Sequence, residues 1–220
     1  MLTKQNHESC KEMAYANTRL DNEQRHLLKA LIGMRLEAIH FHAATGEFCA
    51  WEWVWLEFED RIIEVSNGLE TVEYYGPVEE VSVFRVRQVE SIDPNKHLDG
   101  KPVRRFAIGE IVNDVFLVED ERFRHNGEEL IDTFVVTDAI ALKMESQDIC
   151  IKKTIWFSEM ADIDFGPNFM ELLNDVTYDF DDADEEAEDG NALSARRIVQ
   201  GVGSFDPLVV IETQKGGCPE

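Results

Sequence analysis

Two histidines, His40 and His42, are the residues whose type and spacing could most directly support chemistry. Side chains two residues apart on a β-strand point to the same face, so this pair could supply two ligands to a zinc or iron ion. Cys49 or Glu52, on the segment that follows, could approach as further ligands. Because a metal site needs three or four placed ligands, we expect the pair to be structural and metal-free. A small metal-dependent enzyme centred on the two histidines is kept as an alternative.

Other signatures of catalysis or cofactor binding are missing from the sequence. It contains no Gly-x-Ser-x-Gly, phosphate-loop or His-Glu-x-x-His motif. Asp182, Asp184 and Glu186 alternate as in a calcium loop, but Ala187 and Leu193 stand where that loop needs a glycine and a bidentate glutamate. The four cysteines are far apart and form no Cys-x-x-Cys pair. We therefore expect no cofactor and no enzymatic activity.

Three tryptophans, Trp51, Trp53 and Trp55, alternate along one stretch and should share one face of a strand. Each carries about 150–250 Å² of aromatic surface, which is rarely exposed in patches on monomers. One interpretation is that a helix over residues 22–32 covers them as the second layer of a sandwich. The other is a partner-binding surface, because tryptophan and tyrosine are enriched at binding hot spots. Its candidate residues are Trp51, Trp53, Trp55, Tyr74 and Tyr75.

The charge of the chain restricts its partners. Asp and Glu number 45 against 21 Lys and Arg, which gives a net charge of −24. Residues 175–189 hold nine of these acids and no basic residue, so the rest of the chain still carries −15. Such a surface repels nucleic acids and anionic membranes and attracts a basic protein. The candidate contacts in the acidic run are Asp179, Asp181, Asp182, Asp184, Glu185 and Glu186.

Three classes of function compete on these features. The first is an acidic binding protein that neutralises a basic partner, as an immunity protein does for a toxin or an inhibitor for a nuclease. The second is a nucleic-acid mimic that blocks a DNA- or RNA-processing or defence enzyme, with residues 179–189 standing in for phosphates. The third is the metal-dependent enzyme described above. We adopt the first, because it accounts together for the charge, the missing catalytic motifs and the aromatic stripe.

The amino-terminal residues show no apolar segment after a basic start, so no signal peptide is expected. No window approaches 18 uncharged apolar residues, the length of a membrane-spanning helix. We expect a cytoplasmic protein with reduced cysteines.

An apparent internal repeat predicts how these residues are positioned. The spacing Gly-x-x-aliphatic-x-x-aliphatic-x-apolar follows both Gly33 and Gly109, and Asp60 and Asp138 come after a similar strand in each copy. We therefore predict an α+β fold of two tandem pseudo-repeated units, built of mostly antiparallel strands with a few covering helices. The predicted division is a first unit (1–92), a connector (93–103), a second unit (104–176), an acidic loop (177–191) and a C-terminal segment that packs back (192–220).

Five local predictions refine this plan. A helix over residues 22–32 is capped by Asp21 or Asn22, and a second helix covers residues 167–176. Asn67-Gly68 predicts a tight hairpin turn. Residues 119–129 form a charged connection, and residues 192–200 form a short helix.

Overall fold

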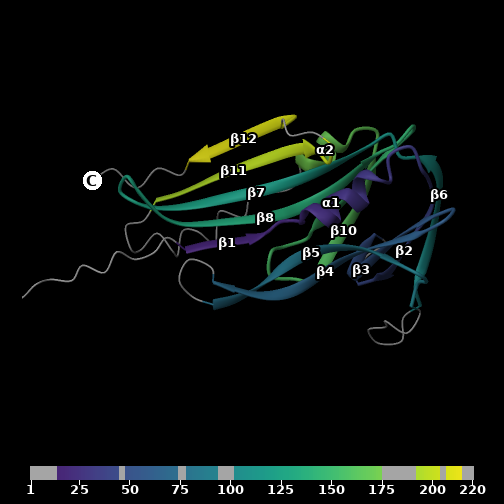
Figure 1. Ribbon diagram of the computed structural model, residues 1–220, viewed down its shortest axis with the longest axis horizontal. Helices are drawn as coiled ribbons and strands as arrows, with labels where there is room; N and C mark the ends of the chain where they lie inside the picture. The colour runs from purple at the N-terminus through teal and green to yellow at the C-terminus, as the bar shows by residue number, and fades with distance from the viewer. Residues whose placement is uncertain are drawn as a thin grey trace, which may run out of the picture.

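Most of the chain forms one large, mostly antiparallel β-sheet in the computed structural model (Figure 1). The structure describes residues 14–44, 48–73, 78–93, 102–174, 192–203 and 207–214. The strands are β1 (Ala14–Thr18), β2 (Arg35–Ala43), β3 (Cys49–Phe58), β4 (Ile62–Glu73), β5 (Val78–Val89), β6 (Arg104–Ile111), β7 (Asp114–Asn126), β8 (Glu129–Lys143), β9 (Asp148–Lys153), β10 (Met160–Gly166), β11 (Ala192–Gly201) and β12 (Val209–Gln214). The helices are α1 (Asn22–Lys29) and α2 (Phe169–Asn174).

The sheet follows the order β12-β11-β7-β8-β9-β10-β3-β2-β6 and branches at two long strands. One edge of β8 pairs with β9 and, farther along, with β1 in parallel. One edge of β3 likewise pairs first with β10 and then with β4. The other edge of β4 pairs with β5. The branched sheet curls into two layers, with β7, β8, β11 and β12 in one and β2 to β5 in the other (Figure 1).

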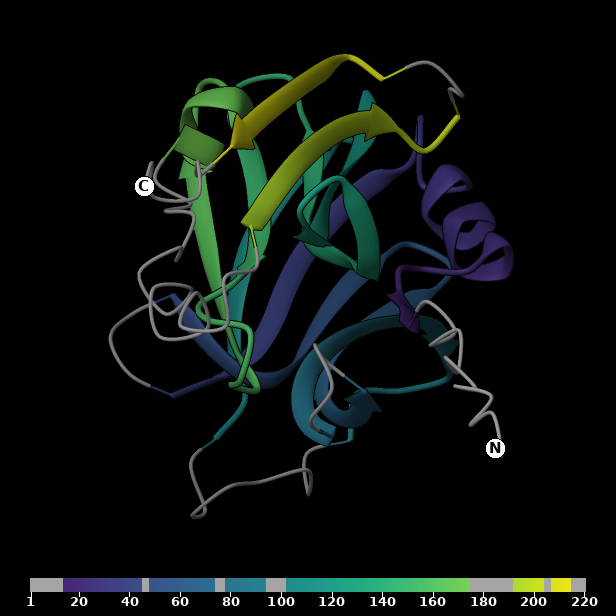
Figure 2. The same cartoon turned by 90° about the vertical axis from the view of Figure 1, so that its left-hand side faces the viewer.

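The main core fills the space between the layers. It joins apolar side chains of α1 to those of the strands, including Leu28, Leu36, Leu56, Leu117 and Ile140. Helix α1 begins as predicted, because the Asp21 side chain accepts from the Gln24 amide and the Gln24 side chain accepts from the Asp21 amide. Helix α2 covers a second cluster on the far side of β7, β8 and β9, and the two helices lie on different sides of the sheet (Figure 2).

The predicted duplication is not confirmed. Gly33 follows α1 in a turn with φ +85°, whereas Gly109 lies inside β6 with φ +74°. Asp60 lies in the turn between β3 and β4, whereas Asp138 lies within β8. The similar spacing reflects apolar alternation shared by many strands, and the mostly antiparallel sheet with two short helices is the part of the prediction that holds.

Three local predictions are wrong for a common reason: pairing with distant strands overrides the local signal. Asn67-Gly68 lies in the middle of β4. The side-chain amide of Asn67 donates to the carbonyl oxygens of Ser158 at 3.0 Å and Met160 at 3.1 Å, which holds this part of the strand against a distant segment. Residues 119–126 continue β7, and residues 192–201 form β11, which pairs with β7 along its whole length. Charged residues are accommodated in both strands because they face one another across that pairing.

The sheet also contains strands from both predicted units, with β10 paired to β3 and β6 paired to β2. Of the predicted connector, only residues 93, 102 and 103 are described, and the predicted acidic loop lies outside the described residues.

Glu52 has a left-handed backbone, with φ +62°, at the point where β3 changes partners. Residues 49–51 pair with β10 and residues 53–57 pair with β4, and between them the Glu52 amide donates to the Glu159 carbonyl oxygen at 2.9 Å. A non-glycine residue in this region is strained by about 1–2 kcal/mol. The branch of the sheet therefore depends on a locally unfavourable conformation.

Comparing Glu52→Gly with Glu52→Ala isolates this strain, because both variants lose the same side-chain contacts. We expect the free energy of unfolding of Glu52→Gly to be about 1 kcal/mol higher than that of Glu52→Ala, since glycine adopts positive φ without steric cost. Chemical denaturation measures the difference. Equal stabilities of the two variants would show that the branch point is not strained.

Candidate functional site

A row of polar side chains crosses the face of the sheet opposite to the core. The register places His40 of β2 beside Trp55 of β3, Trp55 beside Glu64 of β4, and Glu64 beside Arg87 of β5. Trp55 Nε1 donates to Glu64 Oε2 at 2.9 Å, and Arg87 Nε donates to Glu64 Oε1 at 2.8 Å. Glu64 is buried, and these two donors compensate its charge.

Glu57 extends this row towards β6. Its Oε2 lies 2.7 Å from His40 Nε2 and accepts from Arg105 Nε at 3.2 Å. The hydrogen bond with His40, followed by that with Arg105, lowers the pKa of Glu57 below its usual value. Glu57 is thus an ionised carboxylate at the edge of the row, held in place by two neighbours.

The tryptophan stripe is not a continuous exposed surface. Trp55 is fully buried and Trp53 stacks on it, with ring centroids 6.4 Å apart, while Trp51 and Trp53 are half-buried. The predicted covering helix is not the cover, because α1 packs in the core with Val54 and Leu56 on the opposite face. Tyr74 and Tyr75 lie outside the described residues.

His40 and His42 do share a face with the tryptophans. His42 is buried, with its ring edge-on to Trp55 at 6.0 Å. Within the described ranges, no group of three or more His, Cys, Asp or Glu side chains is arranged to hold a metal ion. The Nε2 atom of His40 instead lies 2.7 Å from Glu57 Oε2.

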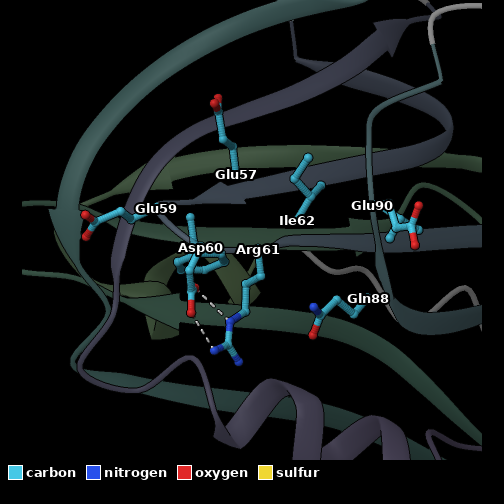
Figure 3. Close-up of a pocket in the computed structure, with 9 residues that line it drawn as sticks. Glu57, Glu59, Asp60, Arg61, Ile62, Gln88 and Glu90 are labelled. Atoms are coloured by element: carbon cyan, nitrogen blue, oxygen red, sulfur yellow. Dashed lines mark hydrogen bonds and ion pairs between the residues drawn. The ribbon is translucent and has the colours of Figure 1, made fainter.

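An open depression lies beside Glu57, where the β3–β4 turn meets the end of β5 (Figure 3). Its volume is about 690 Å³. Its lining residues are Glu57, Phe58, Glu59, Asp60, Arg61, Ile62, Gln88, Val89 and Glu90. Asp60 binds Arg61 through two hydrogen bonds of 2.9 Å, and the Glu59 and Glu90 side chains lie on either side of that pair (Figure 3). Four carboxylates and one guanidinium make this a locally negative surface with apolar side chains among the charges.

The acidic run that the sequence suggested as a phosphate mimic, from Asp179 to Glu186, lies outside the described residues. Of the residues that the sequence suggested, the structure brings the histidines and Trp55 together, and Glu57 joins them through His40.

A second group of charged residues, which the sequence did not single out, is buried between β7, β8 and β11. Arg197 donates to both oxygens of Asp120, at 2.7 and 2.6 Å, and its Nη2 also donates to Asp138 Oδ2 at 3.0 Å. All three side chains are at most 4% exposed. Asp138 is the extra residue at a register shift between β7 and β8, and such a bulge redirects a side chain.

Lys153 completes this buried ionic cluster. Its ammonium donates to the Ser82 carbonyl oxygen of β5 and is attracted by Asp138 and Asp120. Burial lowers the pKa of Lys153 to about 7, against those attractions. Burial likewise raises the pKa of Asp120, although Arg197 opposes the shift. With Lys153 protonated, two cations face two carboxylates and the cluster is neutral.

Only a weak sequence signal marks the cluster. Asp120 and the adjacent pair Arg196-Arg197 are opposite charges about 75 residues apart, and nothing local shows that their strands are neighbours. Asp138 is marked in the sequence only by its place after a strand of the apparent repeat, which indicates no chemical role.

Comparisons with known protein families, with curated proteins and with solved structures find no match for this chain. Neither helix of the described part is long and apolar enough to cross a membrane.

Two adjacent arginines allow a direct test of the buried cluster. Arg197→Met leaves Asp120 and Asp138 buried without their main partner and should lower the free energy of unfolding by about 3–5 kcal/mol. Arg196→Met removes a partly exposed pair with Glu121 and should cost less than about 1 kcal/mol. Urea denaturation of both variants gives the comparison, and equal losses would contradict the structural role of Arg197.

Proposed function

We propose that the protein binds a basic protein and neutralises it, as an immunity protein or inhibitor does for a toxin or nuclease. The observation that carries the proposal is the depression at the β3–β4 turn, where Glu59 and Glu90 lie on either side of the Asp60–Arg61 pair (Figure 3). Arg61 is already paired with Asp60, and Glu57 is paired with His40 and Arg105, so Glu59 and Glu90 are the carboxylates available to a cation from outside the chain.

The composition of the depression suits a lysine or arginine side chain of the partner. Such side chains lay their methylene groups along apolar surface and keep the charged end among polar groups. Ile62 and Val89 can contact the methylenes, while Glu59 and Glu90 can bind the ammonium or guanidinium group.

The whole chain supports the same proposal through its long-range field. A net charge of −24 attracts a basic protein from a distance and speeds the encounter, an effect that salt screens over about 8–10 Å. The half-buried Trp51 and Trp53, farther back on the strand that leads into this acidic surface, are candidate anchors, because aromatic side chains often dominate interfaces.

Charge reversal in the depression tests the proposal. A partner is captured from lysate of the source organism at low salt, identified and purified, and its association is followed by stopped-flow fluorescence. We expect Glu59→Lys/Glu90→Lys to slow association about tenfold or more at low ionic strength, because rim charges act mainly on the association rate.

The matched control is Glu128→Lys/Glu129→Lys, which makes the same change in net charge at the exposed β7–β8 turn. It should slow association much less. Equal effects of the two double variants would assign binding to net charge and not to the depression. If the partner is not basic, or if its binding ignores both salt and charge reversal, the proposal is wrong.

Deletion of residues 179–189 separates this proposal from nucleic-acid mimicry. We expect the deletion to slow association only in part, with strong salt dependence remaining. Complete loss of binding with no effect of the depression variant would favour the mimic.

A further inference from the structure

The loop that joins β9 to β10, residues 154–159, is fixed along its length by neighbouring strands, and we call it the strap. Ser82 of β5 donates its amide to the Trp156 carbonyl oxygen at 2.6 Å. The Asn67 side chain of β4 donates to the Ser158 carbonyl oxygen at 3.0 Å, and the Glu52 amide of β3 donates to that of Glu159 at 2.9 Å. The strap therefore bridges three strands of one layer.

Trp156 anchors the strap to the other layer. Its Nε1 donates to Asp138 Oδ1 at 3.1 Å, its ring lies 3.7 Å from the guanidinium carbon of Arg122, and it contacts the Phe134 ring at 5.3 Å. Ile155 and Phe157, on either side, are 47% and 45% exposed. The strap thus ties the two layers together with one half-buried aromatic residue and displays two apolar ones.

Lys153, the residue immediately before the strap, is only 4% exposed. Its ammonium donates to the carbonyl oxygen of Ser82, whose own amide holds Trp156. One residue of β5 therefore holds both the lysine and the strap. Separating β5 from the strap would break both contacts and bring the ammonium into water.

We propose that the strap is a proton-driven gate, in which Lys153 takes up a proton when β5 and the strap separate, so that acidification favours the open state. The gate is independent of the partner-binding function proposed above. Opening would expose Trp156 and the carboxylates that it covers.

The charged groups that face Lys153 come from four strands. Asp138 of β8, Asp120 of β7 and Glu70 of β4 favour its protonated form, and Arg85 of β5 disfavours it. Burial outweighs them and brings the pKa of Lys153 to about 7 in the closed state, against 10.5 for an exposed lysine. Between these two values only the open state holds the proton, so each unit of falling pH favours opening tenfold. Below about pH 7 both states are protonated, and the dependence ends.

Neighbouring groups whose pKa is raised would act in the opposite direction. Burial raises the pKa of Asp120 and brings that of Cys150 to about 12, so loss of their protons on opening would favour the open state as pH rises. A gate driven by Lys153 is therefore recognised by the sign of its pH dependence, measured between pH 7 and 9.

Hydrogen exchange of the Ser82 amide, followed by NMR, tests the gate in the full-length protein. After correction for intrinsic exchange, we expect its protection to rise about fiftyfold from pH 7 to pH 9, because half of the closed state is already protonated at pH 7. Lys153→Met, which removes the titrating group but keeps an apolar side chain against Phe84, should abolish this rise. The Val112 amide, which donates to the Met34 carbonyl oxygen at 2.9 Å and lies away from the strap, should show no such rise.

Three outcomes would overturn the proposal: a flat or falling protection of Ser82, a rise that persists in Lys153→Met, or the same rise at Val112, which would mean global unfolding. If the variant does not fold, the ¹³Cε resonance of Lys153 in the unaltered protein decides. A titration midpoint near 10.5 contradicts the gate, and one near pH 7 supports it only together with the rise in Ser82 protection in the unaltered protein.

Discussion

The interaction between buried Arg197 and the carboxylates of Asp120 and Asp138 is the constraint on which much of this structure depends. Burying three charges is unfavourable unless each has closely placed partners, so the strands that carry them have little freedom in register. Arg197 fixes β11 against β7 and reaches β8 through the bulge at Asp138. Asp138 then accepts from Trp156, which holds the β9–β10 strap, so one ionic cluster links four separate segments.

The acidic residues of this chain therefore have two different roles. Glu64, Asp120 and Asp138 are buried and compensated by arginines, and they contribute to the arrangement of the strands. Others, such as Glu59 and Glu90, lie at the open depression and give the surface its negative field. A net charge of −24 alone cannot distinguish the two groups, and the binding function proposed here depends on the second.

What the sequence could predict follows the range of the interactions involved. Helix α1 with its Asp21 cap and the strand face shared by Trp53 and Trp55 depend on neighbours in sequence, and local patterns identified them. The hairpin turn predicted from Asn67-Gly68 does not form, because the Asn67 side chain donates to the Ser158 carbonyl oxygen in a loop about 90 residues away. Residues 119–129 and 192–200 were misassigned because their charges have partners on distant strands. The acidic depression was missed for the same reason, since β3–β4 turn residues meet the end of β5 only in the folded chain.

The most direct test of this account is a double-mutant cycle between Arg197 and Asp120. The free energies of unfolding of Arg197→Met, Asp120→Asn and the double variant are measured by urea denaturation under identical conditions. Arg197→Met leaves the buried carboxylates of Asp120 and Asp138 without their main partner. Removing the charge of one of them, by Asp120→Asn, should therefore restore stability. We expect the double variant to be more stable than Arg197→Met alone, with a coupling energy of about 2 kcal/mol or more. Strictly additive losses would show that the two residues do not depend on each other, and would contradict the central place given to this cluster.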